Sequence, residues 1–357
     1  MTTSEQQFAG FWIVSNYSCN NRCNFCYTEA QGFPSERLSL ENQKGIIDSM
    51  AELGAKKCTL IGGEPTLHPN IVDVIEYGSQ HGLKMKVVTN GRKYANKDFL
   101  QRMIDAGMSF TAISVHGSSK EEHAGNTGVE RSFDETLDGI KNCIRLNVPF
   151  VTLTTINASN KDRVCDMARF LHSLGVKSIV YNLASPIEGD TVNDKILSPA
   201  ELANIIQGSY KVLKSEGIQA HFYATVPLCL FDRDLLTSMI DESYLIPLSG
   251  GAMSECNIYD GSGIAFDPTG NILACTHQVN SPIEAILDDQ QKIKPREEVR
   301  EILLRVRQAI GPENWKYPSE DCDACEMRMK CIGGCPLFWR YFKPDDYIDK
   351  FAISPQL

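Results

Sequence analysis

The feature that most constrains the fold is an alternation, over the first two-thirds of the chain, of short apolar runs with longer amphipathic stretches. The apolar runs are rich in β-branched residues and are bounded by turn residues, which is typical of buried strands. They are Phe11–Tyr17, Lys57–Ile61, Lys84–Thr89, Phe110–Val115, Phe150–Ile156 and Ser178–Leu183. Helical periodicity lies between them, at about 40–54, 70–82, 97–107, 132–147 and 160–174. Six such repeats predict a parallel sheet with right-handed crossovers.

The expected helices carry start and stop signals. Ser39 and Asn160 precede two of the amphipathic stretches, and Gly54 and Gly175 follow the same two stretches. These residue types are typical of helix N-termini and C-termini, respectively. Because strands this apolar need cover on both faces, the sequence predicts an α/β fold. A curved partial barrel and a doubly wound sheet both fit this pattern.

The sequence pattern changes after His221. A further helix is expected at about 199–216, and beyond it come short turns, a hairpin at about 267–271, a helix near 295–309 and a cysteine-rich tail. We therefore predict a domain over residues 1–225, a smaller α+β domain over 226–345 and a tail over 346–357.

Charge and cysteine content narrow the class of protein. The 357 residues include 45 acidic and 35 basic side chains, for a net charge of −10, which disfavours nucleic acid as a partner. The N-terminal residues lack a signal-peptide pattern, and no run approaches the ~20 apolar residues of a membrane span. We therefore expect a cytoplasmic protein with no membrane partner. Its 13 cysteines, an odd number, argue against a fully paired disulfide framework and point to metal binding or catalysis.

Three cysteines, Cys19, Cys23 and Cys26, lie within eight residues directly after the first expected strand. Three thiolates can hold three corners of a cubane iron–sulfur cluster. The missing fourth cysteine would leave one iron open to a ligand from outside the protein. From spacing alone, a zinc ion with a distant fourth ligand is the alternative.

The CxxxCxxC loop has the aromatic Phe25 before its third cysteine, and a second motif follows the second strand about 36 residues later. That motif consists of Gly62, Gly63, Glu64 and Pro65. Together the two motifs resemble the radical S-adenosylmethionine (radical SAM) superfamily and its GGEP motif. The glycines would bring backbone close to a ligand, and the carboxylate could meet the ammonium group of that ligand.

This resemblance implies a partial (βα)6 TIM-like barrel over roughly residues 8–225, with a [4Fe–4S] cluster on the three cysteines. S-adenosylmethionine (SAM) would chelate the open iron. An electron from a donor such as flavodoxin or ferredoxin would split SAM into methionine and a 5′-deoxyadenosyl radical, which abstracts hydrogen from the substrate. The cofactor would carry the chemistry, and the protein would position the reactants.

Further cofactor contacts are expected where polar residues end the strands. The candidates are Asn90, Ser114, His116, Asn157 and Asn182. Each of these could equally cap a neighbouring helix. Arg131 could pair with the methionine carboxylate of SAM, or it could lie in solvent.

A second cysteine pattern follows residue 225. It comprises Cys256, Cys275 in the element Gly270-x4-Cys275, and the run Cys322-x2-Cys325-x5-Cys331-x3-Cys335. This pattern resembles the SPASM extension of radical SAM enzymes, which implies one or two auxiliary iron–sulfur clusters, of the [4Fe–4S] type. A zinc ribbon would explain the CxxC…CxxxC part alone.

The resemblance also suggests how these cysteines divide. An inner site near the barrel would use Cys256, Cys275, Cys335 and, as a fourth ligand, Cys229. The outer site would use Cys322, Cys325 and Cys331. Because no cysteine follows Cys335, its fourth ligand is expected to be Asp345, Asp346, Asp349 or solvent, unless the position is vacant or the site defective. Cys229 could instead pack as a small hydrophobe, as we expect of Cys58, Cys143 and Cys165.

Two features bear on the substrate. The cysteine loop begins at residue 19, so no N-terminal peptide-binding domain is expected, and a peptide would be held by the barrel mouth, by the SPASM region or by a separate protein. Thr276 stands where sulfatase-maturing relatives have an aspartate base, which weakens formylglycine formation. The adjacent His277 becomes a candidate proton acceptor, with a structural histidine as the alternative.

The leading hypothesis is an enzyme that oxidises or cross-links a ribosomally made peptide. The alternative is a radical SAM dehydrogenase, epimerase or decarboxylase that acts on a sugar or another small metabolite. A metal-binding scaffold without activity is the third reading, which the GGEP motif after a strand disfavours.

Overall fold

The computed structural model describes residues 8–28, 32, 35–187, 194–247, 256, 259, 261, 263–311 and 314–347. Its centre is an 11-stranded sheet of order β11-β10-β9-β1-β2-β3-β4-β5-β6-β7-β8. The strands are β1 (Gly10–Val14), β2 (Lys57–Ile61), β3 (Lys84–Thr89), β4 (Met108–Ser114), β5 (Phe150–Ile156), β6 (Ile179–Leu183), β7 (His221–Ala224), β8 (Leu245–Pro247), β9 (Gly263–Phe266), β10 (Asn271–Leu273) and β11 (Glu284–Ala285). Neighbouring strands from β1 to β8 pair in parallel.

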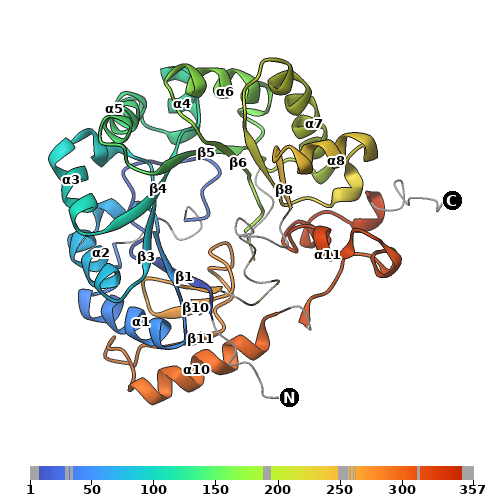
Figure 1. Ribbon diagram of the computed structural model, residues 1–357. Coiled ribbons are helices and arrows are strands. Elements are labelled where there is room, and N and C mark those ends of the chain that lie inside the picture. Colours follow the sequence, from blue (N-terminus) through green and yellow to red (C-terminus); the bar gives the residue numbers. More distant parts are fainter. Residues whose placement is uncertain are drawn as a thin grey trace.

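Helices cover the outer face of the curved sheet (Figure 1). The helices of the described residues are α1 (Leu40–Glu52), α2 (Ile71–Gln80), α3 (Lys97–Asp105), α4 (Lys120–Thr127), α5 (Ser132–Arg145), α6 (Val164–Ser173), α7 (Pro199–Ser215), α8 (Arg233–Asp241), α10 (Arg296–Ala309) and, in the C-terminal cysteine run, α11 (Arg328–Cys331). Short 3-10 helices connect them: η2 (Pro65–Leu67), η3 (Arg92–Ala95), η4 (Lys161–Arg163), η5 (Leu228–Leu230), η7 (Glu320–Ala324), η8 (Phe338–Arg340) and η9 (Pro344–Asp346).

The elements form where local chemistry favours them. Ser39 caps α1 by accepting a hydrogen bond from the backbone of Asn42, and Ser198 and Glu201 form a capping box at the start of α7. The apolar faces of the helices pack on the sheet in one continuous core, in which Cys58 and Cys143 are fully buried as expected. The partial barrel predicted from the sequence is confirmed.

The sequence missed four elements of this barrel. β7 and β8 have four and three residues, and α4 and α8 have eight and nine, which is too short for a clear periodic signal. The first strand was also predicted too long, since β1 ends at Val14 and not at Tyr17. The two missed strands extend the parallel sheet beyond the six expected repeats.

The C-terminal part of the chain contacts both edges of the barrel. β9 pairs in parallel with β1, and β9 and β10 form the expected hairpin, in which the Asp267 side chain accepts hydrogen bonds from the backbone of Thr269 and Asn271. Near the other edge, residues of α8 and α11 line one cavity. The sheet therefore continues across residue 225, and the domain division there stays a prediction. None of the described helices has the length and apolar content that crossing a membrane requires.

Candidate active site

The first cysteine loop, residues 19–26, is joined to the end of β2 by backbone hydrogen bonds. Gly63 donates to the carbonyl oxygen of Asn16 (2.8 Å), and Glu64 donates to that of Ser18 (2.9 Å). A Cβ atom on Gly62 would lie 2.2 Å from the Asn16 oxygen, and one on Gly63 would lie 2.2 Å from the Tyr17 oxygen. The two glycines of the GGEP motif are thus required because the chain segment that leads into Cys19 lies against them.

The carboxylate of Glu64 is buried and accepts four hydrogen bonds. The donors are the backbone and hydroxyl groups of Thr66, the hydroxyl of Thr89 and the backbone N–H of Asn90. Burial raises the pKa of Glu64, and these hydrogen bonds oppose that shift. Glu64 therefore fastens the end of β2 to the end of β3, and its expected contact with the ammonium group of SAM stays a prediction.

Residues that follow β3 hold the middle of the cysteine loop. Asn90 donates from its side-chain amide to the side chain of Asn20 (2.6 Å). Arg92, whose side chain is 2% exposed, donates to the backbone carbonyl of Asn20 and to the side chain of Asn21, and it pairs with Glu135. Arg92 was not predicted from the sequence, because its burial is set by the fold; a buried arginine that bonds to the cysteine loop is typical of a positioning residue.

Helix α4 holds the opposite side of the loop. The backbone N–H groups of Arg22 and Asn24 donate to the carbonyl oxygens of Thr127 (2.8 Å) and Asn126 (3.1 Å). Gly128 ends this helix with φ 68°, and a Cβ atom there would lie 2.8 Å from the Arg22 oxygen. A helix that the sequence did not predict is therefore part of the support for the cysteines.

The three cysteines themselves are half-buried. The sulfur of Cys19 accepts a hydrogen bond from the backbone of Asn21 (3.3 Å), and burial, with the nearby Glu64, raises the pKa of the Cys19 thiol to about 12. In the described part of the chain, no three His, Cys, Asp or Glu side chains gather around a position for one metal ion. Three thiols on one anchored loop are the donor set that a cubane cluster takes.

The other expected cofactor contacts lie in differing environments. Ser114 and Asn182 are half-buried at the ends of β4 and β6, and Phe25 is half-buried in the loop. Asn157 is fully buried, where its side chain bonds to Asn126, Thr155 and Ser159. Arg131 is 76% exposed and pairs with Glu135 at 3.7 Å, which places it in solvent. The roles of these residues toward SAM stay predictions.

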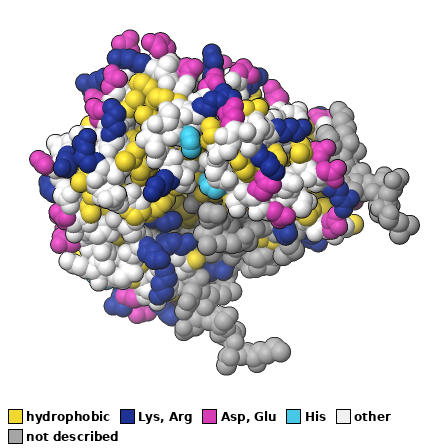
Figure 2. All heavy atoms as spheres, turned by 45° about the horizontal axis from the view of Figure 1, so that its top comes forward, with side chains coloured by type: hydrophobic (Ala, Val, Ile, Leu, Met, Phe, Trp, Pro, Cys, Tyr) yellow, Lys and Arg dark blue, Asp and Glu magenta, His cyan; other side chains and the backbone are white. Residues whose placement is uncertain are grey.

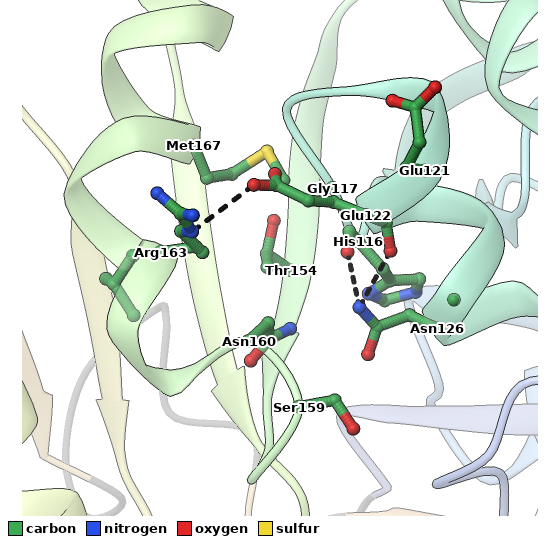
Figure 3. Close-up of a pocket in the computed structure, with 12 residues that line it drawn as sticks. His116, Gly117, Glu121, Glu122, Asn126, Thr154, Ser159, Asn160, Arg163 and Met167 are labelled. Atoms are coloured by element: carbon green, nitrogen blue, oxygen red, sulfur yellow. Dashed lines mark hydrogen bonds and ion pairs between the residues drawn. The ribbon is translucent and has the colours of Figure 1, made fainter.

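A small cavity of about 160 Å³ lies between α4 and α6, at the ends of β4 and β5 (Figure 3). Glu122 and Arg163 form an ion pair of 3.3 Å across it, and Asn126 donates to the carbonyl of His116. The His116 ring contacts Phe25 edge to face, with 4.8 Å between the ring centroids, and burial lowers the pKa of His116 to about 3.

On the face shown in Figure 2, Lys and Arg side chains are interspersed with Asp and Glu side chains.

The cysteines of the C-terminal region form two groups. In the inner group, the charges that act on the thiol of Cys335 are those of Cys256 and Cys275. The outer group lines a cavity of about 460 Å³ and consists of Cys229, Cys322, Cys325 and Cys331. The structure thus places Cys229 with the outer group, and its predicted place in the inner group is wrong. The reason is that the turn after β7, which carries Cys229, packs on Cys331.

The expected non-cysteine ligands of the outer site do not fit this geometry. Asp345 and Asp346 belong to η9 and are not among the residues that line the cavity. Asp349 lies outside the described residues.

Tyr27 connects the first loop with the inner group. Its hydroxyl donates to the carbonyl of Gly62 (3.2 Å), and its ring lies 5.3 Å from the ring of His277. The Nδ1 atom of His277 is 3.9 Å from the sulfur of Cys275, and burial lowers the pKa of His277 to about 4. The imidazole is therefore neutral near pH 7. Tyr27 could not be predicted from the sequence, because its partners are distant in the chain.

Comparison with known proteins supports the reading of the first region. Residues 13–171 match the model of the Radical SAM superfamily. An AdoMet-dependent heme synthase of Methanosarcina barkeri is 24% identical over 324 residues, which cover 88% of this chain and 87% of that protein. A probable GTP 3′,8-cyclase of Thermococcus kodakarensis is 27% identical over 49% of this chain, and the match spans 57% of the cyclase.

Solved structures share the fold at low sequence identity. Streptococcus suis SuiB bound to its precursor peptide SuiA superposes with a TM-score of 0.67 at 14% identity, over 95% of this chain and 74% of SuiB. The protein anSMEcpe with bound AdoMet superposes with a TM-score of 0.67 at 15% identity, over 96% of this chain and 97% of anSMEcpe. Both comparisons extend through the C-terminal cysteine region.

Proposed function

We propose that this chain, which carries a radical SAM domain, is an oxidoreductase that cleaves SAM reductively and removes a hydrogen atom from its substrate. The observation that carries the proposal is the anchored loop of Cys19, Cys23 and Cys26 at the carboxyl ends of the first strands. Ligands of such sheets bind at these strand ends. The family match over residues 13–171 includes both this loop and the GGEP motif.

The three cysteines would hold a [4Fe–4S] cluster. When bound, this cluster supplies the electron that divides SAM into methionine and a 5′-deoxyadenosyl radical. The chain's own residues keep the loop in place: Asn90 and Arg92 bond to residues 20–21, and α4 bonds to residues 22 and 24. Half-burial of the cysteines limits the access of water to the site.

The C-terminal cysteine groups would remove the second electron. A substrate that has lost a hydrogen atom becomes a closed-shell product when it also gives up one electron and, where needed, one proton. His277, whose ring contacts Tyr27 between the first loop and the inner group, would be the acceptor of that proton. Auxiliary iron–sulfur clusters on the two groups would be the electron acceptors.

Two substrate classes are candidates. A ribosomally made peptide is the first, because the chain has both cysteine groups of the SPASM pattern, and most SPASM enzymes modify peptides. A small molecule is the second. It is favoured by the heme synthase relative, which matches this chain over 88% of its length, whereas the likeness to SuiB is one of fold.

The test is anaerobic reconstitution with iron and sulfide, followed by incubation with SAM, a reductant and candidate substrates of both classes. We expect 5′-deoxyadenosine to form, and we expect a mass loss of two hydrogens, or of the group released on oxidation, in one substrate class. Deuterium at the reacting carbon should appear in the 5′-deoxyadenosine. A Cys165→Ser variant is the matched control, since Cys165 lies in α6 away from the three cysteine groups. If reconstituted protein formed no 5′-deoxyadenosine above the level without enzyme, the proposal would be refuted.

A further inference from the structure

We infer that Cys229 completes the outer site, so that this site is a closed iron–sulfur site of four cysteines, one of which comes from the barrel. Cys322, Cys325 and Cys331 supply the other three thiolates. The inference rests on the proposed auxiliary clusters and not on the cleavage of SAM at the first loop.

The chain after β7 packs directly on the C-terminal cysteine run. The backbone N–H of Leu228 donates to the sulfur of Cys331 (3.1 Å), and that of Cys335 donates to the carbonyl of Thr225 (2.7 Å). Gly334, with φ 77°, lies so close to Pro227 that a Cβ atom would be 3.0 Å from its ring. The turn that carries Cys229 is therefore fixed at two points against the CxxxC segment.

The cavity beside this turn has the thiol lining that a cluster site needs. It measures about 460 Å³, whereas a cavity of about 10–15 Å³ is enough for one water molecule. Four thiols line it, and its wall also includes three basic residues, Arg233, Arg328 and Lys330, and two acidic ones, Asp241 and Glu326. The excess of one basic residue would offset part of the negative charge that four thiolates bring to a cluster. An ion pair between Arg233 and Glu326 joins α8 to the cysteine run beside the cavity.

The electrostatic environment of the thiols agrees with this division. The thiols that act electrostatically on the Cys229 thiol are those of Cys331, Cys322 and Cys325. Those that act on Cys335 come from Cys256 and Cys275 instead. A Cys229 that was merely a packed hydrophobe would not need to share a cavity with three other thiols.

The assignment accounts for all 13 cysteines. Three belong to the first loop, four to the outer site, three to the inner group, and Cys58, Cys143 and Cys165 to none of these. The inner group then has three thiolates, as the first loop has, and it would take a ligand of another kind at its fourth position.

The test measures metal and the reactivity of Cys229 in the full chain. Cys19, Cys23 and Cys26 are first replaced by Ala, so that the result does not depend on SAM chemistry. Iron and zinc are then counted after anaerobic reconstitution, and electron paramagnetic resonance (EPR) spectra are recorded. Two cubane clusters predict about eight irons per chain in this background. Cys229→Ser should remove about four of them, or convert one cluster to a three-iron form with its own EPR signal, and Cys165→Ser should remove none.

Two double variants identify the site to which Cys229 belongs. After Cys322→Ser and Cys325→Ser, adding Cys229→Ser should remove no further iron, because the outer site is already lost. After Cys256→Ser and Cys275→Ser, adding Cys229→Ser should remove the remaining cluster or convert it to the three-iron form. The opposite pattern would assign Cys229 to the inner group and overturn the inference. Zinc in the outer site would also overturn it. So would a Cys229→Ser protein that contains as much iron as the Cys165→Ser protein.

A second measurement does not require a variant at Cys229 to fold. In reconstituted protein, Cys229 should resist alkylation by iodoacetamide, as read by mass spectrometry of its peptide, and it should react after the iron is chelated. In the Cys322→Ser and Cys325→Ser protein this protection should be lost, whereas in the Cys256→Ser and Cys275→Ser protein it should persist. Protection that followed the inner cysteines would contradict the inference.

Discussion

The first cysteine loop and the outer cysteine group both bring thiols together, but they do so by different means. The loop takes its three cysteines from eight consecutive residues, and the neighbouring strands and α4 hold that short segment by its backbone. The outer group joins Cys229 to a run about a hundred residues later, through packing between the turn after β7 and the CxxxC segment. Metal ligands that lie in one short segment can be identified from their spacing in the sequence. Ligands that lie in two distant segments can be grouped only when the fold shows which segments come together.

The largest effect is expected from removal of the thiols of the first loop, which tests whether the two regions have separate roles. Replacing Cys19, Cys23 and Cys26 by Ala should reduce 5′-deoxyadenosine formation at least about a thousandfold, to the background level, because the proposed SAM cleavage would require the cluster on these cysteines. The auxiliary sites should keep their iron, since they lie on other segments. Chromatography of the products and an iron assay measure both effects. SAM cleavage that persisted in this variant would refute the assignment of the loop.

A single substitution in the outer group should have the complementary effect: it should disturb the outer site and leave the first loop intact. Cys322→Ala should lose the substrate product while SAM is still cleaved without coupling to product, because the first site remains intact. The ratio of product to 5′-deoxyadenosine, measured in one reaction, gives the result. Normal product formation by this variant would mean that the outer site has no part in the reaction.

The support of the first loop can be tested with two arginines that pair with the same Glu135. Arg92→Met removes a buried guanidinium that bonds to residues 20 and 21, and it should lower the free energy of unfolding by about 3 kcal/mol. Arg131→Met changes a side chain that is 76% exposed, so the effect should stay within about 0.5 kcal/mol. Denaturant unfolding compares the two variants. Equal effects would show that Arg92 does not position the loop.

Lowering the pH should reduce the free energy of unfolding through His123, which lies in α4, the helix that bonds to the first loop. Burial lowers the pKa of His123 to about 4, from an ordinary value near 6.5. As the pH falls, His123 is therefore protonated in the unfolded chain before it is protonated in the folded chain. The free energy of unfolding decreases between pH 6.5 and 4 as a result. His123→Gln should make the loss between pH 7 and 5 smaller by about 2 kcal/mol. Unfolding curves at both pH values test this, with the exposed His172 changed to Gln as the control; equal losses in the two variants would contradict the role of His123.

Most of the barrel could be predicted from the sequence because its signals are local. β2, β3 and β5 have the predicted bounds, and the predicted helices fall within a few residues of α1, α2, α3, α5 and α7. The missed β7, β8 and α4 are short, and their positions are set by contacts with neighbours and not by periodicity. α4 matters most among them, because two of its backbone carbonyl groups bind the cysteine loop.

The candidate site could be predicted where one segment contains it. The spacing of Cys19, Cys23 and Cys26 and the GGEP motif identified the first region without the structure. The place of Cys229, the buried Arg92 and the contact between Tyr27 and His277 depend on residues that are distant in the chain. Family analogy placed Cys229 in the inner group, and the cavity lining corrects that prediction.

The central claim is that the first loop's cluster keeps one iron open for SAM, and the most direct test is spectroscopic. The EPR spectrum of the anaerobically reduced protein is recorded with and without SAM. We predict that SAM changes the spectrum in the parent protein and in the Cys322→Ser and Cys325→Ser variant, but not when Cys19, Cys23 and Cys26 are Ala. A spectrum of the parent protein that SAM leaves unchanged would contradict the claim.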